Sequence, residues 1–128
     1  MNTSKYLQSY GYLYVLMLSF KVFQPTKRLH ILSFNLLFVL VCIFLYTQLI
    51  DHNFCRTGIR SFVTYYNHNT IKRYFDIYMD KGLISLSYSK GNRVYYKLTE
   101  QAINIIKDLN SNYDKVLYQF CNKYNIVL

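Results

Sequence analysis

The stretch from Leu36 to Tyr46 reads LLFVLVCIFLY, eleven apolar or aromatic residues without a polar interruption. A helix made from such a run is apolar on every side, so protein or lipid must cover it all round. The longer segment Leu29 to Ile50 has twenty-two residues, and a membrane span needs about 20. The run therefore predicts either a membrane span or the central helix of a hydrophobic core.

Charge narrows the range of partners. The 128 residues include 15 Lys and Arg but only 6 Asp and Glu, giving a formal net charge of +9. Between residues 56 and 97 only Asp76 and Asp80 oppose the basic residues Arg56, Arg60, Lys72, Arg73, Lys81, Lys90, Arg93 and Lys97. Such a basic region favours a polyanion, either nucleic acid or an anionic membrane surface.

Enzyme and metal chemistry have no support in the sequence. There is no Gly-rich phosphate loop, no His-Glu-x-x-His and no nucleophile elbow, so we expect neither an enzyme nor a cofactor. We also expect no metal site, because ligand spacing is missing among His30, His52, His68, Cys42, Cys55 and Cys121. Reduced structural thiols are the expected state of the cysteines, as in a cytosolic protein.

The chain is expected to form a single domain over residues 1–128. The only proline, Pro25, separates two apolar stretches, Tyr6 to Phe20 and Leu29 to Ile50, and each is predicted to be a long helix. Pro25 and Thr26 suit the start of the second helix. The segment DHNFCRTG, from Asp51 to Gly58, is predicted to be the turn region that closes it.

Two further helices are predicted from apolar residues at helical spacing. The first presents Ile59, Phe62, Val63 and Tyr66 and ends at the segment NHN. The second begins near Asn69, with Asn69 or Asn67 as its N-cap. Its apolar face consists of Ile71, Tyr74, Phe75 and Tyr78. Gly82 is expected to end this helix in a left-handed conformation.

A β-hairpin and two helices are predicted to complete the chain. Residues 83–89 and 93–99 alternate as strands do, and the segment KGN joins them as a turn. Thr99 is a capping residue for a helix whose apolar face is Ala102, Ile105, Ile106 and Leu109. A final helix is expected over about residues 112–124.

A short helix, a tight turn, a second helix and a hairpin together resemble a winged helix-turn-helix. The segment TIKRYFDIYMDKGLI resembles the recognition helix of bacterial winged-helix regulators, and RVYYKLTEQA resembles the second wing strand and following helix of the PadR and MarR groups. Ala102 stands where those groups usually have glycine. The resemblance covers residues 59–109 and implies a transcriptional regulator that binds double-stranded DNA.

The resemblance also indicates which residues would contact DNA. On the helix beginning near Asn69, the side chains not needed for the core provide groups that read base edges or contact phosphate. We expect the wing to lie against the DNA backbone or the minor groove. The predicted DNA-binding residues are His68, Asn69, Thr70, Lys72, Arg73, Lys90, Asn92 and Arg93. An alternative for Lys72 and Arg73 is the solvated face of an amphipathic helix.

Topology and polarity favour a core helix over a membrane span. The segment Leu29 to Ile50 includes the polar residues His30, Ser33, Asn35, Thr47 and Gln48. Lys21, Lys27 and Arg28 precede it, and the positive-inside rule would keep that side in the cytoplasm. A single span would then place residues 51–128 outside the cell, where a DNA-binding domain has no duplex.

We therefore predict a mainly helical α+β protein, a cytoplasmic winged helix-turn-helix regulator that binds DNA as a homodimer. Residues 1–50 would supply core and dimerisation helices, residues 56–109 the winged helix-turn-helix, and residues 110–128 a C-terminal dimerisation helix. A small-molecule effector is common in MarR-like proteins, but the sequence identifies no ligand. The alternatives are a small membrane-associated protein with a basic domain and a winged-helix module that binds protein.

Overall fold

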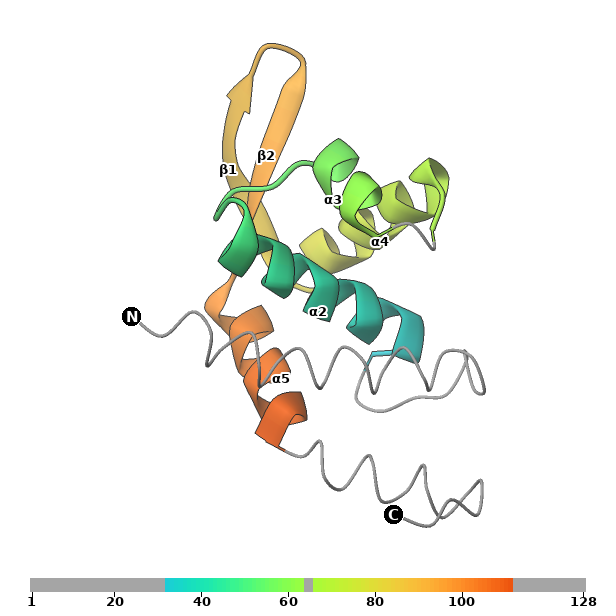
Figure 1. The fold of residues 1–128 in the computed structure, drawn as a ribbon, viewed down its shortest axis with the longest axis vertical. Coiled ribbons are helices and arrows are strands. Elements are labelled where there is room, and N and C mark those ends of the chain that lie inside the picture. The colour runs from blue at the N-terminus through green and yellow to red at the C-terminus, as the bar shows by residue number, and fades with distance from the viewer. Residues whose placement is uncertain (1–31, 64–65, 112–128) are drawn as a thin grey trace.

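The computed structural model describes residues 32–63 and 66–111. Over these residues the chain has an α+β fold with four helices and one two-stranded antiparallel hairpin (Figure 1). The element order agrees with the prediction and is compatible with a winged-helix layout. The predicted helices at residues 6–20 and 112–124, and the predicted helix start at Pro25, lie outside the described residues.

Helix α2, Phe34–Leu49, forms the centre of the fold. Nine consecutive side chains, from Leu37 to Leu45, are each at most 7% exposed. In Figure 1, α3, α4 and the hairpin lie on one side of α2, and α5 lies on the other. The prediction that this run forms a core helix is confirmed, although its 16 residues are fewer than predicted. Within the described part of the chain, no helix is long and apolar enough to cross a membrane.

Helix α3, Arg56–Phe62, begins and ends earlier than predicted. The predicted turn region ends at Cys55, because the Cys55 thiol caps the helix by accepting a hydrogen bond from the Gly58 N–H over 3.4 Å. At the other end, Val63 adopts an extended conformation that stops the helix. Tyr66 is therefore not helical, although it still packs against the core.

Helix α4, His68–Asp80, has well-defined ends. Its C-terminus forms a Schellman motif, in which the Leu83 N–H donates to the Tyr78 carbonyl and the Gly82 N–H donates to the Met79 carbonyl. Gly82 has φ +70°, a conformation that costs glycine little. The helix stop predicted at Gly82 is confirmed, and the chain turns there directly into the hairpin.

Strands β1, Ile84–Lys90, and β2, Arg93–Leu98, form the hairpin close to the predicted ranges. The connection is two residues, Gly91 and Asn92, and Gly91 has φ +62°, as the tight turns of hairpins require. Beyond Ser85 every residue of β1 is exposed. The hairpin therefore projects from the body of the protein, as Figure 1 shows.

Helix α5, Glu100–Ser111, follows the hairpin and packs against α2. The Thr99 hydroxyl accepts a hydrogen bond from the Ala102 N–H at 3.3 Å and donates one to the Gly82 carbonyl at 2.7 Å. The predicted cap is confirmed, and Thr99 also joins the end of α4 to the start of α5. The four predicted apolar residues of α5 are all buried: Ala102, Ile105, Ile106 and Leu109.

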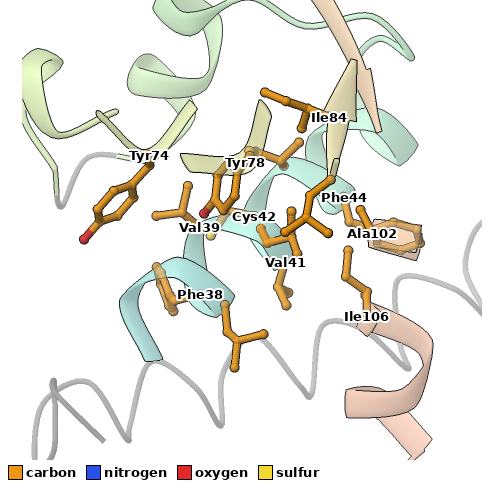
Figure 2. Close-up of a cluster of buried hydrophobic side chains, with 14 of the residues drawn as sticks. Phe38, Val39, Val41, Cys42, Phe44, Tyr74, Tyr78, Ile84, Ala102 and Ile106 are labelled. Atoms are coloured by element: carbon orange, nitrogen blue, oxygen red, sulfur yellow. The ribbon is translucent and has the colours of Figure 1, made fainter. Parts of the chain in front are cut away.

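The core is formed where α4 and α5 meet α2 (Figure 2). Figure 2 shows side chains of α2 facing Tyr78 of α4 and Ala102 and Ile106 of α5. The Tyr78 hydroxyl, although surrounded by apolar groups, donates a 2.6 Å hydrogen bond to the Leu36 carbonyl. Burial raises the pKa of Tyr78 above its ordinary value, so the phenol remains a donor at neutral pH.

Burial also raises the pKa of the Cys42 thiol, from 9.0 to about 12. Because the folded-state pKa lies above the unfolded one, the contribution of Cys42 to stability is complete below pH 9 and is lost as the pH rises from 9 towards 12. We expect the free energy of unfolding to fall by about 1.4 kcal/mol per pH unit from this group alone.

Urea denaturation at a series of pH values between 7 and 11 measures this loss. The Cys42→Ala variant is the control, since it removes the thiol and should show a shallower decline above pH 9. Tyr78 contributes a loss of the same sign in both proteins. An identical pH profile for the two proteins would contradict the assignment of this effect to Cys42.

Candidate nucleic-acid interface

Helix α4 has one buried face and one exposed face. Its buried side chains are those predicted from helical spacing, Ile71, Tyr74, Phe75 and Tyr78. Because buried residues repeat at three- and four-residue intervals, the intervening positions face solvent. The exposed residues of α4 are His68, Asn69, Lys72, Arg73, Asp76, Met79 and Asp80. Polar and basic groups thus occupy its first two turns, and the two acids come later.

The N-terminus of α4 differs by one residue from the prediction. Asn67 caps the helix, its Oδ1 accepting a 2.9 Å hydrogen bond from the Thr70 N–H, and His68 is the first helical residue. Of the two predicted caps, Asn67 is correct, and Asn69 is an exposed residue of the first turn. Because Asn69 is not needed for capping, its amide is available to a ligand.

The predicted site residues on α4 are accessible to different degrees. His68, Asn69, Lys72 and Arg73 are exposed, whereas Thr70 is half-buried. The Arg73 guanidinium carbon lies 5.7 Å from the centre of the Tyr74 ring, within the range of a cation–π interaction. This contact holds the arginine close to the helix surface while leaving the side chain exposed.

The second group of predicted residues lies at the hairpin tip, where Lys90, Asn92 and Arg93 are all exposed. Lys90 and Arg93 are paired directly across the strands on either side of the two-residue turn. Like charges in such a pair repel each other and weaken the hairpin. The tip is therefore a compact cationic surface that a bound anion would stabilise.

Three aromatic rings connect α4 to the hairpin. Phe75 of α4 meets Tyr96 of β2 edge to face at 5.1 Å between ring centres, and Phe54 lies 5.8 Å from Phe75. Phe54 also pairs with Tyr96 through two backbone hydrogen bonds of 2.9 and 2.7 Å. This aromatic triad of Phe54, Phe75 and Tyr96 fixes the base of the hairpin relative to α4.

The sequence did not identify Phe54, because the segment Asp51 to Gly58 is typical of a turn. In the structure Phe54 is fully buried and adds a single strand-like pair to β2. A single bridge has no alternating pattern, so no periodic signal marks it. The isolated aromatic residue within a polar segment is the only sign of it in the sequence.

Three exposed cations of the basic run between residues 56 and 97 lie outside the predicted set of site residues: Arg60 on α3, Lys81 at the end of α4 and Lys97 on β2. This run is visible in the sequence. Helix α3 packs against α4, and β2 leads from the hairpin tip to the aromatic triad. The basic surface of the described region therefore extends beyond the predicted residues.

The end of α2 lies close to the hairpin. The pKa of Tyr46 is raised by burial and, to a smaller extent, by the neighbouring Cys55, Asp51 and Tyr95. The Tyr46 ring also meets Phe62 edge to face, with 5.6 Å between their centres. One residue of β2, Tyr95, is therefore near the end of α2.

The described region contains neither a cluster of metal-binding side chains nor a disulfide. Within residues 32–63 and 66–111, no group of three or more His, Cys, Asp or Glu side chains is placed to hold a metal ion. Cys42 and Cys55 are both buried and not in a disulfide. The exposed residues among the predicted site residues are cations, amides and one imidazole, which suit phosphate oxygens and base edges.

Comparison with protein-family models, with curated proteins and with solved structures found no match to this chain.

Loss of the α4 cap should be measurable in the free protein. Replacing an Asn cap by Ala costs about 1 kcal/mol, so we expect Asn67→Ala to lower the free energy of unfolding by roughly that amount. Asn69→Ala is the matched control, since Asn69 is exposed and should change stability by less than about 0.5 kcal/mol. Urea denaturation of both variants tests the assignment, and equal losses would contradict it.

Proposed function

We propose that this chain is a sequence-specific transcriptional regulator that binds double-stranded DNA through a winged helix-turn-helix formed by α3, α4 and the hairpin. The observation that carries this proposal is that two exposed surfaces lie on elements joined by the aromatic triad. One is the polar and basic first half of α4, and the other is the cationic hairpin tip. The aromatic triad fixes the position of α4 relative to the base of the hairpin.

The exposed face of α4 suits the major groove of DNA, which admits an α-helix. Asn69 has the donor and acceptor needed for adenine, and Arg73 has the paired donors that match guanine. Lys72, beside Arg73 on the same face, supplies a charge for the phosphate backbone. His68 and the half-buried Thr70 complete the first turn, which is the part of a recognition helix that enters the groove.

The hairpin tip suits the flanking backbone or the minor groove. Placing Lys90 opposite Arg93 destabilises a free hairpin, so the arrangement is better explained by binding than by stability. A phosphate group near both side chains would replace their repulsion by attraction. Asn92 in the turn adds a hydrogen-bonding group at the same place.

We further propose a cytoplasmic homodimer. The helices expected at residues 6–20 and 113–124 would form the dimer, and they lie outside the described residues. Two-fold symmetry would require a pseudo-palindromic DNA site with half-sites about 34–36 Å apart. Selection of bound sequences from a random duplex pool tests the function directly, and failure to enrich any sequence would refute it.

A protein-binding winged-helix module is the second candidate function. Such a module would cover Leu86 on β1, a large apolar side chain that is 60% exposed. Duplex DNA binding that weakens steeply with salt would favour the regulator over this alternative.

Arg73 provides a test of base recognition. We expect Arg73→Ala to weaken binding to the selected site by about 5- to 150-fold and to relax sequence preference at one base pair, because a bidentate contact to guanine is lost. Fluorescence anisotropy with the selected duplex and its single-base variants measures both effects. An unchanged preference at every position would exclude Arg73 from base recognition.

Lys90 provides a test of phosphate contact. We expect Lys90→Ala to weaken binding to all duplexes similarly and to reduce the slope of log K against log salt by about 1. Lys107→Ala is the charge-matched control, because exposed Lys107 belongs to α5, on the other side of α2 in Figure 1. Equal effects of the two substitutions would show only the influence of total charge.

A further inference from the structure

The hairpin contains an irregularity that changes the direction of one side chain. Leu86 pairs with Tyr96, whereas Tyr88 pairs with Tyr95, so Ser87 is an extra residue in β1. In a regular strand Tyr88 would point to the same face as Leu86. The β-bulge instead places Tyr88 on the opposite face, beside Tyr95.

The two tyrosine rings brought together by the bulge are stacked. Their centres are 4.7 Å apart and their planes differ by 12°. Tyr88 is 46% exposed, whereas Tyr95 is half-buried and near the end of α2. Tyr95 is thus the more covered ring of the pair, and Tyr88 is the more exposed one.

The stack lies between the anchored base of the hairpin and its cationic tip. At the base, Phe54 bonds to the backbone of Tyr96, and the Ser87 hydroxyl donates a hydrogen bond to Asn53 Oδ1. Lys90 lies two residues beyond Tyr88 on β1, and Arg93 lies two residues before Tyr95 on β2. These two cations are paired across the strands and repel each other. The stack is therefore the aromatic contact placed to keep that end of the hairpin closed.

We propose that Tyr88 and Tyr95 are positioning residues of the DNA interface, whose stack holds Lys90 and Arg93 where they meet the nucleic acid. This inference rests on the proposed function. The two rings act through the cations and not by contact with DNA. In the free protein they offset the repulsion at the tip, so the hairpin binds without first having to be ordered.

The DNA-binding test compares Tyr88→Ala with Tyr88→Phe and Leu86→Ala. We expect Tyr88→Ala to weaken duplex binding by about 2- to 10-fold, the range expected for an aromatic pair. Tyr88→Phe keeps the ring and should bind as the unsubstituted chain does. Leu86→Ala is the control, because Leu86 is an exposed apolar residue on the same strand but on the opposite face. It should leave binding unchanged.

A double-mutant cycle separates positioning from direct contact. If the stack acts through the two cations, Tyr88→Ala should cause no further loss in a Lys90→Ala/Arg93→Ala background. A further loss of the same size would mean that Tyr88 itself touches DNA, which overturns the proposal. Amide hydrogen exchange without DNA gives a second readout, and Tyr88→Ala should accelerate exchange at residues 88–95.

Failure of this inference is distinguishable from failure of the proposed function. If the unsubstituted chain binds no duplex DNA, the proposed function is wrong, and a role in positioning DNA contacts falls with it. If the unsubstituted chain binds but Tyr88→Ala binds equally well, or exchange at the tip does not change, only the positioning role is refuted.

Discussion

Burial of α2 on every side from Leu37 to Leu45 is the constraint on which the rest of the described structure depends. Its apolar side chains point in all directions, and each buried one contributes about 1.5–3 kcal/mol when it leaves water. No single neighbour can cover such a helix, so α4 and α5 must approach it from different sides. The placement of α4, and hence the outward direction of its polar face, follows from this requirement.

Much of this arrangement was predictable from the sequence, because it depends on the spacing of apolar residues and on single residues that begin or end helices. Helical spacing identified the buried residues of α4 and α5, and Gly82 and Thr99 marked helix ends correctly. The ends of α3 were wrong, because a thiol cap at Cys55 and an extended Val63 leave no pattern. The bridge at Phe54 and the bulge in β1 also depend on partners distant in sequence, and their register cannot be found from one strand.

The sequence was enough to name the residues of the candidate site, but it did not show how they are arranged in space. Seven of the eight predicted residues are exposed, and Thr70 is half-buried. What the sequence did not show is the connection between the two halves of the site. Phe54, Phe75 and Tyr96 form that connection, and aromatic residues so frequent in this chain do not reveal which three will meet.

The order of the elements along the chain has a consequence for synthesis. The described elements that cover α2 all follow it, and Leu109 is a buried residue near the end of α5. At about 5–20 residues per second, the ribosome needs roughly 3–12 seconds to add the 60 residues between Leu49 and Leu109. During that interval the described elements that cover α2 in the folded protein are still incomplete. The described part of the chain can therefore pack completely around α2 only after synthesis has passed Leu109.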